Sequence, residues 1–178
     1  AYAQAEERVV RELKQLGKPF ILVLNAREPA AAEAQALRER LSERYGVPAV
    51  ALNAREMSQE DILGVFEQVL FQFPLREIRL NVPGWLNALD EDHWLVRHVL
   101  DGVRAGAQNV ARMCDHDDFA AAFAESPYTD GLQTDGIDLG QGRLRYSLPL
   151  REGLFNRVLG EECGTEIRGD AHLLKLMK

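Results

Sequence analysis

The chain has 178 residues, of which 46% are hydrophobic and 28% are charged, a globular mixture able to bury a core in one domain or two small ones. The formal net charge of −7 argues against binding nucleic acid through a general basic surface, because neutralising phosphates requires clustered lysine and arginine. No signal peptide is visible, and no apolar run approaches the roughly 20 residues that a membrane-spanning helix needs. We therefore expect a cytoplasmic protein without direct membrane insertion.

The first part of the chain alternates helical and strand patterns. Helices are expected over 1–16, about 30–45 and from Ser58 onward, with apolar strands over 20–24 and 48–52. Continuous apolar strands are typical of a parallel sheet covered on both faces. Because two parallel strands make poor exposed edges, we expect further strands upstream. Residues 1–73 are thus predicted to form an α/β domain.

Pro74 marks the expected boundary, and residues 74–178 are predicted to form a small α+β domain. Its expected elements are a strand over 75–82, a long helix from about 85 or 90 to 113, a short helix starting at Asp117 or Asp118, a hairpin that joins 137–139 to a strand over 143–150, and short helices over about 151–160 and 169–178.

Both ends of the chain look cut from something longer. The helical spacing of apolar residues begins at residue 1, which is alanine. Residues 172–177 form an apolar run with no helix stop signal.

The strand over 20–24 ends at Asn25, where P-loop nucleotide-binding proteins place a base-reading asparagine. In GTP-binding domains this corner reads N-K-x-D, whereas here it is Asn25-Ala26-Arg27-Glu28. The lysine is missing and the carboxylate is one methylene longer, so the preference for guanine is weakened. Asn25 and Glu28 are candidate base contacts; alternatively, Asn25 only closes a strand–helix turn.

Asn53 follows the second strand, where such domains place another base-facing loop, and it is our third candidate base contact. The phosphate-binding motif G-x-x-x-x-G-K-[ST] is absent from all 178 residues. No serine, cysteine or aspartate lies in a recognisable nucleophile motif. The chain thus carries the base-reading end of a nucleotide site without its phosphate end, and we predict no catalytic residues.

Several other side chains are of types that can bind metal ions or react as thiols. The run Asp115-His116-Asp117-Asp118 has donors that suit Zn or Mn, but a helix end followed by an Asp N-cap also explains it, and we predict no metal site. His93 and His98 are five residues apart and do not share a helix face as i, i+4 ligands would. Cys114 and Cys163 have no metal-ligand spacing, and we interpret both as buried, reduced thiols.

Several segments, taken together and in order, resemble the stage IV sporulation protein A family, the spore coat morphogenetic ATPases of endospore-forming bacteria. They run along nearly the whole chain. The matching residues are 5–14, 16–21, 47–48, 85, 88–90, 92–95, 153–155 and 157–159.

The resemblance implies a P-loop ATPase domain related to translation-factor GTPases, followed by a middle domain. Residues 1–73 would be the last third of the first domain and residues 74–178 the second. The family hydrolyses ATP, with Mg²⁺, to polymerise irreversibly into the basement layer of the spore coat. A small amphipathic peptide anchors it on the outer forespore surface in the mother cell, where other coat proteins join it. Only Asn25 and its loop carry over as possible base contacts.

These observations lead to a first hypothesis and two alternatives. The first is a coat-assembly ATPase represented here by an inactive part that serves structure and self-association, through the long helix and the 143–150 strand as an edge. The second is a GTPase-like regulatory or partner-binding fragment that does not polymerise. The third, a metal-dependent enzyme built on 115–118, is disfavoured.

Overall fold

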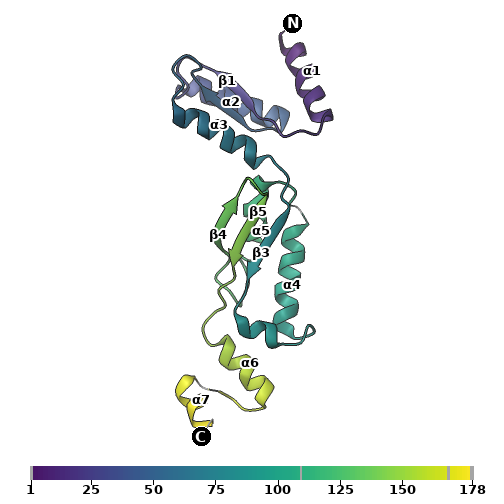
Figure 1. Cartoon of the computed structure of the whole chain (residues 1–178), viewed down its shortest axis with the longest axis vertical. Coiled ribbons are helices and arrows are strands. Elements are labelled where there is room, and N and C mark those ends of the chain that lie inside the picture. The colour runs from purple at the N-terminus through teal and green to yellow at the C-terminus, as the bar shows by residue number, and fades with distance from the viewer. Residues whose placement is uncertain (1, 109, 168, 177–178) are drawn as a thin grey trace. The chain divides into compact units, whose positions relative to one another are not determined.

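The computed structural model describes residues 2–108, 110–167 and 169–176, and these divide into two compact units (Figure 1). The first unit contains the chain up to residue 74 together with 112–114 and 139–141. The second contains 75–111, 115–138 and the residues from 142 onward.

The first unit is a small parallel α/β arrangement. Its elements are α1 (Tyr2–Gln15), β1 (Leu22–Asn25), α2 (Ala32–Tyr45), β2 (Ala49–Leu52) and α3 (Gln59–Phe71). β1 and β2 pair in parallel, with Leu22 opposite Ala49 and Asn25 opposite Leu52. The expected order of helices and strands is confirmed, while the wider P-loop sheet remains a prediction.

Local signals set the helix ends of this unit. Gly46 ends α2 in the left-handed conformation, at φ 57°, where its N–H donates to the carbonyl of Ser42. Ser58 begins α3 in a capping box with Asp61, because each side chain receives the other residue's backbone N–H. The backbone N–H and the hydroxyl of Ser58 both donate to Oδ2 of Asp61, which lowers the pKa of this carboxyl because they favour its charged form.

The apolar faces of this unit are only partly covered. Val10, Tyr45 and Val47 form its buried core, with Phe20, Leu22 and Leu41 packed against them. However, 51% of Val23 on β1 and 61% of Phe66 on α3 are exposed. The expectation that β1 is covered on both faces is therefore wrong for the described residues, because two strands and three helices leave one side of the layer open.

The second unit is an α+β arrangement, as expected. Its elements are β3 (Glu77–Asn81), a 3₁₀ turn (Gly84–Ala88), α4 (Trp94–Ala107), α5 (His116–Ala121), β4 (Gln133–Asp138), β5 (Arg143–Ser147), α6 (Leu154–Cys163) and α7 (Asp170–Leu176). A further 3₁₀ turn, Met113–Asp115, precedes α5. The last expected helix extended to 178, but 177 and 178 lie outside the described residues.

The sheet of the second unit has the order β3-β5-β4. β3 runs parallel to β5 and β4 runs antiparallel to it, so the expected hairpin is confirmed. The expectation that the 143–150 strand is an edge is wrong, because β5 is the central strand and is paired on both sides. Sequence alternation identifies a half-buried strand, but its neighbours depend on contacts distant in the chain.

The long helix is shorter than expected. α4 begins at Trp94, where the ring Nδ1 of His93 accepts the N–H of Leu95 at 3.2 Å, and it ends at Ala107. The segment before it forms the 3₁₀ turn after Pro83 instead of a first helical turn. Met113, which the apolar spacing assigned to this helix, lies instead in the 3₁₀ turn before α5.

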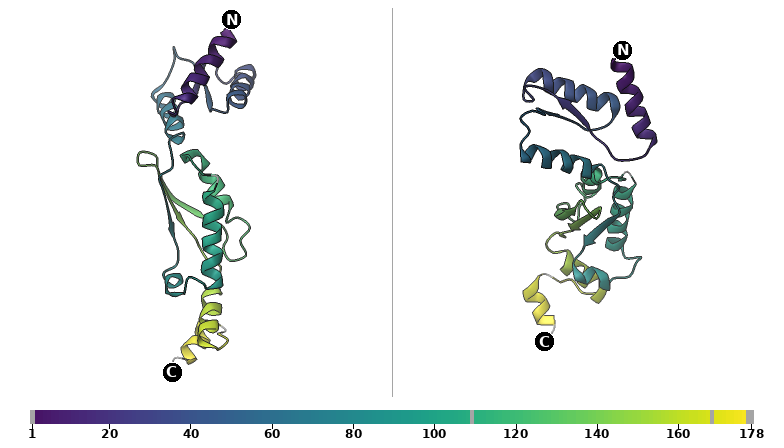
Figure 2. Two further views of the ribbon diagram at one scale, coloured as in Figure 1. Left: turned by 90° about the vertical axis from the view of Figure 1, so that its right-hand side faces the viewer. Right: turned by 45° about the horizontal axis from the view of Figure 1, so that its top comes forward.

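One face of the second sheet carries the core. Leu144 and Tyr146 of β5 are buried, and the ring of Phe119 on α5 stacks on Tyr146 at 5.5 Å between centroids. α4 runs alongside the sheet (Figure 2). α5 approaches α4 closely because Gly102 and Gly106 have no side chains. A Cβ at Gly102 would lie 2.8 Å from the ring of Phe123, which follows α5, and a Cβ at Gly106 would lie 2.9 Å from the ring of Phe119 on α5.

Candidate functional site

The three candidate base contacts lie at the carboxyl ends of β1 and β2. Asn25 is the last residue of β1 and lies opposite Leu52, the last residue of β2, so both following loops leave the same edge of the sheet. The N–H of Ala26 donates to the carbonyl of Leu52 at 2.9 Å, which extends the pairing past the strand end. In parallel α/β sheets this edge is the usual place for ligands.

Asn25 connects the two loops. Its Oδ1 accepts the backbone N–H of Ala54 at 3.1 Å, across 29 positions of sequence. The side chain as a whole is exposed. Asn25 therefore positions the second loop, which goes beyond the local turn closure considered from the sequence.

Asn53 makes the reciprocal connection. Its Nδ2 donates to the carbonyl of Arg27 at 3.1 Å and to Oε2 of Glu56 at 3.2 Å. Its Oδ1 accepts the N–H of Arg55 at 3.1 Å, a turn typical of asparagine. Each asparagine thus bonds the loop that follows the other strand, and the pair holds the corner in one geometry.

Glu28 lies in the loop after β1, next to Arg27, whose carbonyl bonds Asn53. It is exposed, and its carbonyl accepts the N–H of Ala31 at 3.1 Å. Gln35 steadies this loop from α2, because its Nε2 donates to the carbonyl of Pro29 at 2.6 Å. The structure places Glu28 at the outside of the corner, and its contact with a base stays a prediction.

Sequence reasoning missed the groups that complete this corner. The N–H of Ala54, the carbonyl of Arg27 and the carboxylate of Glu56 are the partners of the two asparagines. The position of Glu56, three residues after Asn53, could have indicated their hydrogen bond from the sequence. The backbone partners at Ala54 and Arg27 carry no such sequence signal. The corner thus contains two asparagine amides that are hydrogen-bonded within it, the carboxylate of Glu56 and the exposed Glu28. Its contact with a nucleotide base stays a prediction.

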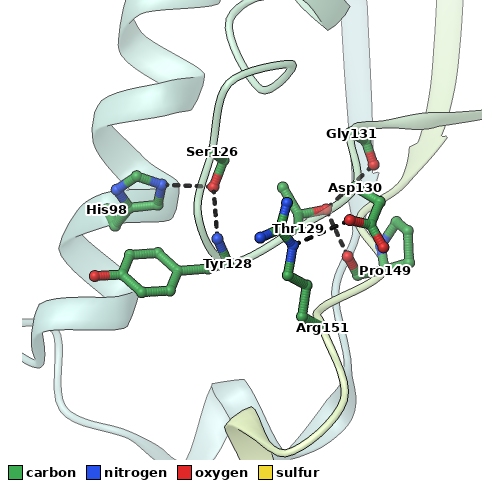
Figure 3. Close-up of polar contacts among 8 residues, drawn as sticks. All are labelled: His98, Ser126, Tyr128, Thr129, Asp130, Gly131, Pro149 and Arg151. Atoms are coloured by element: carbon green, nitrogen blue, oxygen red, sulfur yellow. Dashed lines mark hydrogen bonds and ion pairs between the residues drawn. The ribbon is translucent and has the colours of Figure 1, made fainter.

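A second polar cluster holds the loop over 126–131 in the second unit (Figure 3). His98 Nε2 lies 2.8 Å from Oγ of Ser126, and that oxygen also accepts the N–H of Tyr128 at 3.3 Å. Arg151 pairs with Asp130 at 3.0 Å. Because Ser126 is buried and its oxygen is shared in this turn, we interpret the pair with His98 as a loop attachment and not as a nucleophile with its base.

The acidic run after residue 114 is engaged locally. Asp115 Oδ2 accepts the N–H of Ala111 at 3.0 Å, and His116 Nδ1 lies 3.0 Å from Oδ1 of Asp117. The carbonyl of His116 accepts the hydroxyl of Tyr146 at 2.9 Å. Within the described ranges, no three histidine, cysteine or acidic side chains are grouped so as to hold a metal ion.

The two cysteines are free thiols in different surroundings. Cys114 is half-buried, but Cys163 is exposed, so the expectation that both are buried is wrong. Cys163 is the last residue of α6, directly before Gly164 in the left-handed conformation, and this helix end faces water. None of the helices described in the structure is long and apolar enough to cross a bilayer.

The comparisons with known proteins agree with this two-unit architecture. Residues 1–74 match the model of the stage IV sporulation protein A ATPase domain, and residues 75–178 match the model of the middle domain of the same family. No solved structure matches the chain. The two halves of the chain therefore match two domains of one family.

The similar curated proteins are all named stage IV sporulation protein A. Those of Bacillus subtilis and Bacillus anthracis are 38% identical to this chain, and that of Clostridioides difficile is 37% identical. Each match covers 99% of this chain but only 36% of the relative. The chain belongs to the stage IV sporulation protein A family and spans about a third of the length of these relatives.

Proposed function

We propose that this chain acts as part of a sporulation protein that hydrolyses ATP to polymerise into the basement layer of the spore coat. The observation that carries the proposal is the continuous match of both family domains, at 37–38% identity over 99% of the chain. Its place would be the mother-cell side of the forespore surface, with a small amphipathic membrane-anchoring peptide and other coat proteins as partners. The chain's own part is structure and self-association.

The corner of Asn25 and Asn53 would meet the base of ATP, with Glu28 at its rim. The absence of the lysine and aspartate of N-K-x-D supports adenine over guanine. The chain itself has no phosphate-binding loop motif, so phosphates and Mg²⁺ would be held by other parts of the protein. ATP hydrolysis by the chain alone is not expected.

The test compares the purified chain with the full-length product that contains it. We expect Mg²⁺-dependent ATP hydrolysis and concentration-dependent light scattering from the full-length product, and no hydrolysis from the chain. A full-length product that binds nucleotide without ever assembling would favour the regulatory, GTPase-like alternative. Mg²⁺-dependent turnover by the chain alone would contradict the assignment of the phosphate site to other segments.

A further inference from the structure

A small basic pocket lies in the first unit, at the edge of the sheet where β1 and β2 begin. Its volume is about 300 Å³, and every residue that lines it belongs to this unit. Its walls come from the end of α1, the loops that precede β1 and β2, the end of α3, and Arg112. Asn25 and Asn53 lie at the other ends of these strands, so the pocket is separate from the candidate base site.

Three of the lining side chains are cationic, and none is acidic. Lys14 is in the last turn of α1, and Lys18 follows Gly17, which takes the left-handed conformation at φ 64°. Both lysines are exposed, and among the described residues neither side chain forms an ion pair or a hydrogen bond. The third cation, Arg112, comes from a segment distant in the sequence. The pocket therefore has two ammonium groups available to a ligand.

A buried amide completes the wall of the pocket. Gln72, directly after α3, is 7% exposed, and its Oε1 accepts a hydrogen bond from Nη1 of Arg112 at 3.0 Å. Because a guanidinium can only donate, this contact fixes the amide with its oxygen toward Arg112. Within the part of the chain that the structure describes, Nε2 of Gln72 is left without an acceptor. Since buried polar groups in folded proteins are nearly always hydrogen-bonded, this donor favours a bound molecule that supplies an acceptor.

Compensation of helix ends accounts for part of the positive charge. α1, α2 and α3 all end at this edge, where their last carbonyl groups carry partial negative charge. Lys14 has the position expected for such compensation, whereas Lys18 lies beyond α1 and Arg112 lies outside all three helices. The same carbonyls oppose the entry of an anion, so we expect a weak site, with a dissociation constant on the order of 1 mM.

We propose that this pocket binds a phosphate group. Lys14 and Lys18 supply positive charge, and Nε2 of Gln72, which Arg112 holds in place, supplies a fixed donor. Phosphate has acceptor oxygens in several directions, which matches donors that come from α1, the loop after it and the end of α3. At about 300 Å³ the pocket is at the small end of ligand sites, so it suits inorganic phosphate or a small phosphorylated compound. This binding does not depend on the proposed function, because it involves neither nucleotide nor assembly.

A titration of the purified chain with inorganic phosphate tests the site. Two-dimensional NMR follows the backbone amides while chloride is replaced by phosphate at constant pH and ionic strength. We expect saturable shifts of the amide signals of Gly17, Lys18 and Val47, which line the pocket. The amide of Ala54, at the opposite edge of the sheet, should change little.

Charge-removing variants distinguish the site from general attraction. K14Q and K18Q should each weaken phosphate binding about three- to tenfold, because each removes one charge-assisted contact. Q72M keeps the length of the side chain but loses the amide, and should weaken binding about threefold. R11Q is the matched control, because it removes the same charge from α1 one turn earlier, outside the pocket lining, and should leave the affinity unchanged. Unchanged amide signals in α2 show that each variant is folded.

Three results would overturn the proposal. A chloride titration that shifts the same amides with equal affinity would indicate an adventitious ion only. Full phosphate affinity in the double variant K14Q/K18Q would show that the lysines do not form the site. A lower unfolding midpoint in K14Q, without any response of the unsubstituted chain to phosphate, would leave the lysines with the single role of stabilising the helix end.

Vesicles distinguish a soluble ligand from a lipid headgroup, since both can carry the phosphate. Co-sedimentation with phosphatidylglycerol vesicles but not with phosphatidylcholine vesicles, lost in K14Q/K18Q, would assign the site to a lipid headgroup. Phosphate-dependent shifts without vesicle binding would assign it to a soluble compound. The absence of both responses would overturn the proposal and leave the ATPase assignment standing.

Discussion

The indole Nε1 of Trp94 donates a hydrogen bond of 2.8 Å to Oε2 of Glu161, which joins the start of α4 to α6. The guanidinium of Arg157 lies 4.6 Å from the centre of the same indole and pairs with Glu161 at 2.9 Å. Tyr128 packs against Trp94 at 4.9 Å between ring centroids. One tryptophan therefore attaches both α6 and the loop after α5 to α4.

Replacing Trp94 by phenylalanine should loosen α6. The variant keeps an aromatic ring for Arg157 and Tyr128 but loses the N–H donor to Glu161. Because this pair is partly exposed to water, we expect only about two- to fivefold faster amide exchange in α6. W85F is the matched control: Trp85 contacts Phe155 of α6 through its ring, at 5.6 Å between centroids. Equal exchange rates in α6 for both variants would show that the hydrogen bond contributes nothing.

The same contact predicts a dependence on pH. The hydrogen bond from Trp94, followed by that from Arg157, lowers the pKa of Glu161. A group with a lowered pKa in the folded state stabilises the fold above its ordinary pKa, and this stabilisation is lost as the pH falls through the lowered value. The fluorescence of Trp94, measured in W85F so that it is the single tryptophan, should change over this acidic range. In W85F/E161Q that change should be absent; its persistence would assign the titration to another group.

The hydrogen bond between Asn25 and Ala54 predicts a graded response to substitution. N25A removes the acceptor and should cost about 1 kcal/mol of local stability, whereas N25D keeps an oxygen in place and should cost less. The measurement is amide exchange of Ala54, which should accelerate in N25A. E28A is the control in the same loop and should leave that exchange rate unchanged. If N25A behaved like E28A, the corner would not depend on Asn25.

Alanine substitution is expected to have opposite effects at two helical glycines, one tightly packed and one open to solvent. At Gly106 a Cβ would lie 2.9 Å from the Phe119 ring and 3.0 Å from its carbonyl oxygen, so G106A should destabilise the second unit by about 1–3 kcal/mol. At Gly64 in α3 nothing lies within 4 Å of a Cβ, so G64A should stabilise its helix by about 0.5–1 kcal/mol. Denaturant unfolding of both variants checks the difference in sign.

Thr129 supplies a further test, in the loop shown in Figure 3. It is 2% exposed, and its Oγ1 lies 2.5 Å from the carbonyl of Pro149 and 3.2 Å from that of Gly131. T129V keeps the shape but leaves these part-buried carbonyls without their donor, and should cost about 1–2 kcal/mol. T129S keeps the hydroxyl and should lose less stability. Equal unfolding midpoints for the two variants would contradict a role of this hydroxyl.

Local residue patterns were sufficient for much of the fold. Gly46 ends α2 and Ser58 begins α3 as their sequence positions predict, because caps depend on neighbours within a few residues. The alternation after residue 142 predicts a half-buried strand, and Leu144 and Tyr146 are buried. The position of Asn25 at the end of a strand was also readable, because a strand end is a local property.

The sequence by itself determined the types of element, their order and the family, all of which rest on short-range patterns and on residue identity. Only the tertiary structure decided that β5 is central, that Asn25 bonds Ala54 and that Trp94 bonds Glu161. These contacts join residues distant in the chain, and their formation depends on the relative placement of packed elements. A residue's type shows that it can form a hydrogen bond, but the fold selects its partner.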